Sequence, residues 1–131
     1  MIKIGLDIDN TINASDISKQ FFSIFSILFN NNAKIYIITN REQTEEEYAN
    51  IKKELYDIGI SYDEIIITPD KKKAIEDNNI QILFEDTDEY FQGIGDDVLV
   101  FKIREHGNYD FNDYKWVYSN KTGKNIYEKG K

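Results

Sequence analysis

The sequence predicts an α/β fold, in which a parallel sheet of about five strands lies between helices on both of its faces. Two observations lead to this prediction. Short apolar runs rich in β-branched residues alternate with longer segments whose apolar residues recur every three or four positions. Repeated strand–helix–strand order is also the pattern of right-handed βαβ crossovers in a doubly wound sheet.

The first 40 residues predict a strand, a helix and a second strand. Residues 2–8 are apolar and β-branched, and polar residues follow them, so they form the first predicted strand. Apolar side chains at spacings of three and four over 17–29 predict an amphipathic helix, with Asp16 near its N-cap and the asparagines 30–32 at its end. Residues 34–39 form an unbroken apolar run, which is typical of a buried parallel strand.

A second helix and a third strand follow. Thr44 and Glu47 have the spacing of a capping box, which predicts that a helix begins there. This helix extends through the apolar residues up to position 58 and ends at Gly59. Residues 64–68 are apolar and precede a proline, so they predict the third strand.

The last predicted elements of the core are a short helix and two strands. Asp70 can cap a helix over 71–78, and the apolar runs 80–84 and 97–102 predict the fourth and fifth strands. The complete pattern is that of a three-layer, Rossmann-like fold.

The chain length of 131 residues predicts a single domain. Its core is residues 1–102, and no separate cap domain has room; the C-terminal extension is 103–131. Within the extension, 114–118 and 124–128 flank the Gly-containing segment 120–123, which indicates a β-hairpin-like tail.

Composition limits the classes of protein to consider. The chain has no cysteine, so disulfides and thiolate metal sites are excluded. The N-terminus has no signal-peptide pattern, and no apolar run is long enough to span a membrane. We therefore expect a soluble cytoplasmic protein with no membrane partner.

Charge is unevenly distributed along the chain. The net charge is −8, with residues 1–101 carrying −11 and residues 102–131 carrying +3. An acidic body disfavours nucleic acid as a partner, without excluding it, because that affinity comes from cations that meet phosphates. It fits a site for a divalent cation. A homodimer is compatible with these features.

Polar side chains follow the predicted strands at the edge where ligands bind in open α/β sheets. The first strand provides two aspartates, the second a threonine and two further polar residues, the third leads to three lysines, and the fourth provides several carboxylates. These residues are Asp7, Asp9, Thr39, Asn40, Arg41, Lys71, Lys72, Lys73, Glu85, Asp86 and Asp88.

This set of side chains favours phosphoryl transfer. Clustered carboxylates repel one another unless a cation neutralises them, and all-oxygen ligation favours Mg²⁺. A carboxylate can attack phosphorus to give an aspartyl-phosphate, while a second carboxylate two residues away handles the protons. A hydroxyl, backbone N–H groups and a lysine can stabilise the phosphoryl oxygens.

The same residues resemble the four motifs of the haloacid dehalogenase-like (HAD) superfamily. Residues 7–11, Asp-Ile-Asp-Asn-Thr, resemble its first motif, and Thr39 after a buried strand resembles its second. A lysine in 71–73 resembles the third motif, and Glu85 with Asp86 the acidic fourth. The resemblance covers about residues 1–102, with the motifs in order and in the right strand context.

The resemblance implies catalytic roles. Asp7 would be the nucleophile and a metal ligand, and Asp9 the general acid/base, with its backbone carbonyl also on the metal. Thr39 would bind the phosphoryl group, helped by the N–H of Asn40. Arg41 could bind substrate phosphate, or it could form a surface ion pair with Glu45.

It also implies the remaining metal ligand and the catalytic lysine. Asp86 would bind Mg²⁺, with Glu85 or Asp88 in support. Lys71 is preferred to its two neighbours because it follows the presumed cap Asp70 and would lie nearest the edge of the sheet.

The implied function is Mg²⁺-dependent hydrolysis of a phosphate monoester. No insertion large enough for a cap domain is present, so the chain resembles the small capless phosphatases and nucleotidase-like branches. Its partner would be a phosphorylated small molecule or an exposed phosphate on a macromolecule. The alternatives are a non-catalytic HAD-like module that binds Mg²⁺ and, less favoured, a two-component receiver, whose phosphorylated Asp is not paired with a second Asp on the first strand.

Overall fold

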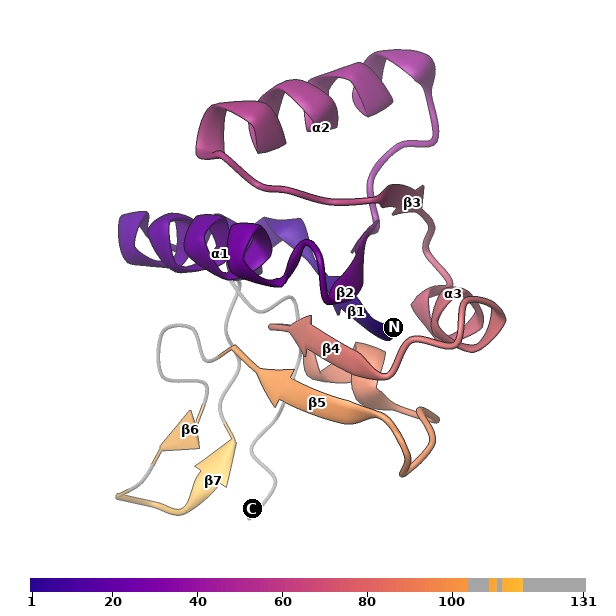
Figure 1. Ribbon diagram of the computed structural model, residues 1–131. Helices are drawn as coiled ribbons and strands as arrows, with labels where there is room; N and C mark the ends of the chain where they lie inside the picture. The colour runs from indigo at the N-terminus through magenta and orange to yellow at the C-terminus, as the bar shows by residue number, and fades with distance from the viewer. Residues whose placement is uncertain (104–108, 111, 117–131) are drawn as a thin grey trace.

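Strand β1 lies at the centre of a five-stranded sheet in which every pairing is parallel, in the order β3-β2-β1-β4-β5 (Figure 1). This computed structural model describes residues 1–103, 109–110 and 112–116. The strands are β1 (Ile2–Leu6), β2 (Ala33–Thr39), β3 (Glu64–Ile67), β4 (Ile82–Glu85) and β5 (Leu99–Lys102). The predicted parallel α/β, Rossmann-like architecture is confirmed.

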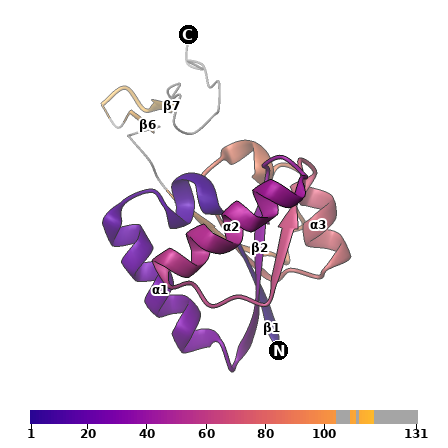
Figure 2. The ribbon, with the colours of Figure 1, turned by 90° about the horizontal axis from the view of Figure 1, so that it is seen from above.

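Helices cover both faces of the sheet. On one face, α1 (Asp16–Phe29) and α2 (Glu45–Ile58) lie side by side (Figure 2). Their buried side chains form the larger apolar core with alternate residues of β1 and β2. On the other face, α3 (Lys71–Asp77) forms a second core with the opposite residues of β2 and β4. Two-sided burial explains why these strands are continuous apolar runs rather than alternating ones.

The first strand is shorter than predicted, because the chain turns at its end. Strand β1 stops at Leu6, and the predicted continuation to Ile8 is wrong: residues Ile8–Ile12 form a kinked turn, η1, in which Asp9 and Asn10 have non-helical backbone angles. Within η1, Asn10 has φ 59°, a left-handed conformation that asparagine tolerates better than most residues. This turn places the side chains that follow β1 at the carboxyl edge of the sheet.

Helix ends follow local sequence signals. Ser15, directly before Asp16, is the N-cap of α1 and accepts a hydrogen bond from the Ser18 N–H. Asp70 caps α3 by accepting from the Lys73 N–H. The predicted capping box of α2 is only half formed: the Thr44 hydroxyl oxygen accepts from the Glu47 N–H, but the Glu47 carboxylate contacts Arg41 instead of returning to the cap.

After β4, a single 3₁₀ turn, η2 (Asp88–Phe91), packs near α3. In the C-terminal extension, β6 (Tyr109–Asp110) and β7 (Lys115–Trp116) form a short antiparallel pair. The predicted hairpin paired 114–118 with 124–128; β7 overlaps its first arm, whereas its second arm lies outside the described residues. No helix in the described ranges is long and apolar enough to cross a membrane.

The role of Gly59 in ending α2 can be tested by substitution. Its φ is 90°, and an added Cβ would lie 2.9 Å from the Ser23 hydroxyl oxygen of α1. We expect Gly59→Ala to lower the free energy of unfolding by about 1–2 kcal/mol, because an L-residue is strained in this conformation. Denaturant unfolding would measure it. Tyr56→Ala, at an exposed position on the same helix, is the control, and equal stability of the two variants would contradict the assignment.

Candidate functional site

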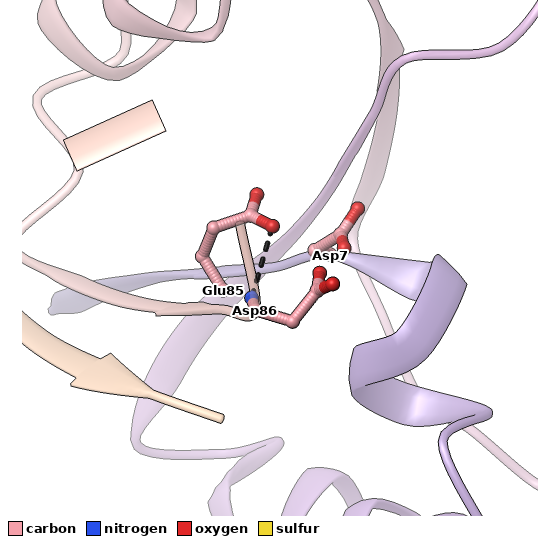
Figure 3. Close-up of side chains that lie close together, drawn as sticks. All are labelled: Asp7, Glu85 and Asp86. Atoms are coloured by element: carbon pink, nitrogen blue, oxygen red, sulfur yellow. Dashed lines mark hydrogen bonds between the residues drawn. The ribbon is translucent and has the colours of Figure 1, made fainter. Parts of the chain in front are cut away.

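Three carboxylates converge where β1 and β4 end, next to each other at the centre of the sheet. Leu6 pairs with Phe84, so Asp7 and Glu85 follow on neighbouring strands, and Asp86 comes directly after. One carboxylate oxygen from each lies within 4.8 Å of the other two, and all three side chains are buried (Figure 3). The register of β1 against β4 therefore creates the acidic cluster.

Lys71 provides the positive charge of this cluster. Its ammonium Nζ is 2.9 Å from Asp7 Oδ1 and 2.6 Å from Glu85 Oε1, and the residue is only 2% exposed. Lys72 and Lys73 instead pair with acidic residues one turn along α3. Of the three candidate lysines, Lys71 is the one that reaches Asp7, because it is the first residue of a helix that begins beside the cluster.

The electrostatics of the cluster are unbalanced. Burial raises the pKa of Asp7 to about 6, although Lys71 opposes the rise. Burial, the hydrogen bond with Glu85 and the neighbouring Asp7 raise the pKa of Asp86 to about 9. The attraction of Asp7 and Glu85 outweighs burial at Lys71 and raises its pKa, so it stays charged. One ammonium faces three carboxyl groups, and the excess negative charge can be relieved by protons or by a cation.

The donor set fits a hard divalent cation. Every candidate ligand atom in the cluster is a carboxylate oxygen, which is the ligand type of Mg²⁺. Glu85 is already engaged: one oxygen accepts from Lys71, and the other accepts from the backbone N–H groups of Asp86 and Thr87. This leaves Asp7 and Asp86 as the better ligands, with Glu85 in a supporting role. The side chain of Asp88, the other supporting candidate, lies outside the described part of the structure.

Sequence reasoning assigned no role to two groups that contact the acidic cluster. The buried Thr11 hydroxyl lies 3.3 Å from Asp7 Oδ2 and 3.3 Å from Asp86 Oδ1, and it can donate to one of them at a time. Its position in the Asp-x-Asp-x-Thr run was the available signal. Lys102 of β5 donates to the backbone carbonyl of Asp86. Only the pairing of β5 with β4 brings Lys102 there, and no motif marks it.

Tyr90 of η2 is a further residue that the sequence did not reveal. Its ring centroid lies 4.2 Å from Lys71 Nζ, a cation–π distance, and its hydroxyl accepts a hydrogen bond of 2.9 Å from Asn40 Nδ2. It thereby connects two predicted site residues that stand on different elements.

Thr39 and Asn40 follow β2, as predicted. Among the described residues, the Thr39 hydroxyl is a buried polar group without a hydrogen-bond partner. Burial of an unpaired hydroxyl costs about 1–3 kcal/mol, so such a group is expected to meet a ligand or water. Asn40 is exposed beside it.

Asp9 stands apart from the buried cluster. Its side chain is about half exposed and forms an ion pair with Arg41, at 2.7 Å between Arg41 Nη2 and Asp9 Oδ1. Burial alone would raise the pKa of Asp9, but the bonds from Arg41 outweigh it and lower the pKa. The suggested ion pair of Arg41 with Glu45 is wrong, because Arg41 lies over a different face of α2 and pairs with Glu47 and Glu54.

An open groove of about 700 Å³ begins at Asp9 and runs between α1 and α2. Its lining is polar, and it includes Asn13, Asn50 and Lys53. The three carboxylates of the acidic cluster are buried. Asp9 is therefore the site residue that faces both the cluster's end of the sheet and open space.

No family model, curated protein or solved structure matches this chain.

Asp86 allows the electrostatic argument to be tested. A carboxyl whose pKa rises from 3.8 to about 9 on folding costs stability as the pH increases through that range, because the folded state resists losing its proton. We expect Asp86→Asn to stabilise the metal-free protein at pH 7.5 by about 1–3 kcal/mol, and the difference to shrink towards pH 5.

Thermal unfolding across pH, with and without Mg²⁺, measures this effect. Magnesium should stabilise the wild type and stabilise Asp86→Asn much less. Asp96→Asn, at an exposed position, is the matched control. A metal-free Asp86→Asn variant that is less stable than the wild type at pH 7.5 would contradict the excess of negative charge in the acidic cluster.

Proposed function

We propose that this protein is a Mg²⁺-dependent phosphatase that hydrolyses a phosphate monoester through an aspartyl-phosphate on Asp7, as a capless member of the HAD superfamily. The observation that carries the proposal is the buried convergence of Asp7, Glu85 and Asp86 around Lys71 at the carboxyl edge of a parallel sheet. Asp9 stands two residues after Asp7 on the turn η1. These residues are the ones that carry the resemblance in the sequence.

Asp7 and Asp86 would hold the metal, and the backbone carbonyl of Asp9 would be a third ligand from the protein. When bound, Mg²⁺ supplies the positive charge that the three carboxyl groups require and that the phosphoryl oxygens would share. With the cation present, Asp7 is held as a carboxylate, which is the form that a nucleophile needs.

The chain's own residues account for the two chemical steps. In the first step, an Asp7 carboxylate oxygen forms a bond to phosphorus while the bond from phosphorus to the leaving oxygen breaks. Asp9 takes up a proton from solvent when the negatively charged phosphate ester binds beside it, and it gives this proton to the leaving oxygen. In the second step, water attacks the phosphorus of the aspartyl-phosphate, Asp9 takes a proton from the water, and the bond to Asp7 breaks. Inorganic phosphate leaves and Asp7 is restored.

Other groups support the phosphoryl oxygens. The Lys71 Nζ lies 2.9 Å from Asp7 Oδ1. Whichever of the two Asp7 oxygens bonds to phosphorus, the ammonium group would therefore lie close to the phosphoryl group. The Thr39 hydroxyl has a free donor, and a phosphoryl oxygen would satisfy it. The N–H of Asn40 follows at the same end of β2. These donors account for charge stabilisation without a cap domain.

The open groove beside Asp9 would give a substrate access to the site. The leaving group would pass Asp9 and enter the polar groove between α1 and α2. A phosphorylated small molecule and an exposed phosphate on a macromolecule both fit this arrangement.

The nucleophile assignment gives a direct test. We expect the wild type to hydrolyse 4-nitrophenyl phosphate only with Mg²⁺, and Asp7→Asn to reduce kcat by about 10³-fold or more, because the amide cannot attack phosphorus. Asp96→Asn should keep wild-type turnover. Mass spectrometry of the trapped intermediate should place the phosphate on Asp7. Turnover that persists in excess chelator, or phosphate trapped on another residue, would overturn the proposal.

A further inference from the structure

Asp9 is held by a two-bond ion pair. Arg41 donates from Nε to Asp9 Oδ2 at 3.0 Å and from Nη2 to Asp9 Oδ1 at 2.7 Å. Two parallel bonds fix the plane of the carboxylate as well as its distance, which a single contact does not do. A proton-transferring carboxylate needs such an orientation, because its reach to the reacting oxygen is short.

Arg41 is itself fixed from α2. Its Nη1 lies 3.0 Å from Glu54 Oε2 and 3.3 Å from Glu47 Oε1. Glu47 and Glu54 are seven residues apart, so they lie on one face of the helix about two turns from each other. The guanidinium thus directs three of its nitrogens towards three carboxylates, and few of its N–H groups remain for a phosphate.

Asn13 closes the network. Its amide Nδ2 lies 3.1 Å from Glu54 Oε1 and 3.4 Å from Asp9 Oδ1, while its Oδ1 accepts from the Asn10 N–H at 2.8 Å. Glu54 therefore holds both donors that hold Asp9. Asn13 also ties the network to the backbone of η1, the turn that carries Asp9.

We propose that Glu54, acting through Arg41 and Asn13, is a positioning residue that orients Asp9 for proton transfer, and that Arg41 serves this purpose rather than binding substrate phosphate. The inference rests on the proposed function, in which Asp9 is the general acid/base. No sequence motif marked Glu54. Its role follows from the closed set of contacts that joins α2 to the end of β1.

A series of leaving groups tests the proposal. A general acid matters for a poor alkoxide leaving group and little for an acidic phenol. We expect Glu54→Gln to lower kcat/KM about 10- to 100-fold for an alkyl phosphate and to change it less than about threefold for 4-nitrophenyl phosphate. Glu46→Gln, an equal charge change at an exposed position in the first turn of α2, should leave both unchanged. If Glu54→Gln instead raised KM equally for both esters, Arg41 would be assigned to phosphate binding and the proposal would be overturned.

A second readout does not depend on activity. In ¹⁵N NMR spectra, the Arg41 Nε–H should give a signal protected from exchange with solvent in the wild type and in Glu46→Gln. It should lose this protection in Glu54→Gln and in Asp9→Asn. If the wild type hydrolyses no phosphate ester, the proposed function fails, and this signal still decides whether Glu54 fixes Arg41. Equal protection in the wild type and Glu54→Gln would refute the positioning role.

A separate observation concerns α1, which is apolar on two opposite faces. Its inner face is buried against the sheet through Phe22 and Ser26. Its outer face carries four large apolar residues with 4-3-4 spacing, and they remain exposed by between 51% and 71%. These residues, Ile17, Phe21, Ile24 and Leu28, are called the outer stripe. A helix that is apolar all round is typically covered on both faces.

We infer that the outer stripe is the interface with a second copy of this chain. Spacing of four, three and four is the seam of two packed helices. The body of the protein is acidic, but α1 carries only Asp16 and Lys19, so two copies can approach there with little repulsion. The four side chains of the stripe offer roughly 500 Å² for each copy, or roughly 1,000 Å² in total, which is about the least that a specific interface buries.

Sedimentation analysis over a concentration series tests this interface. The wild type should reach twice its chain mass of 15.4 kDa, and Ile24→Lys should stay at the monomer mass with unchanged circular dichroism. Tyr56→Lys introduces the same charge at an exposed aromatic on α2 and should still dimerise. A wild type that remains monomeric, or an Ile24→Lys variant that dimerises equally, would overturn the inference.

Discussion

The ammonium group of Lys71 is the interaction on which the site depends. It lies between Asp7 and Glu85, and it joins β1, β4 and α3 at one point. Removing one partner of a buried ion pair leaves an uncompensated charge, which typically costs 3–5 kcal/mol. The rest of the arrangement follows from this contact: Glu85 is fixed and holds the backbone after β4, Asp86 is directed towards Asp7, and Tyr90 packs over the lysine.

Much of the fold could be predicted from the sequence, because its signals are local. Apolar runs predicted the five strands to within two residues at every end, and Gly59 and Asp70 end and cap their helices as predicted. The convergence of Asp7, Asp86 and Lys71 was also predictable, since parallel strands end at one edge of the sheet. Lys71 could be preferred over the next two lysines because only the first residue of a capped helix stands at that edge.

The remaining contacts depend on tertiary placement, which one sequence does not reveal. Arg41 pairs with Glu47 and Glu54, which share one face of α2, whereas spacing alone favoured Glu45 on another face. Tyr90 reaches the site through a turn with no recurring pattern. The outer face of α1 was also not predicted. The periodicity predicted an amphipathic helix, but it could not show that some of the apolar residues lie on an exposed face.

The pairing of β1 with β4 also determines when the site can form. Asp7 and Glu85 are far apart in the chain, and β1 pairs with β2 through contacts that are closer in sequence. As the chain leaves the ribosome, β1, β2 and β3 can assemble while one edge of β1 is still open, and Glu85 and Asp86 reach Asp7 only when β4 occupies that edge. The last central strand to be synthesised is therefore the one that completes the charged cluster, so a chain made only as far as α3 has Asp7 and Lys71 without the other two carboxylates.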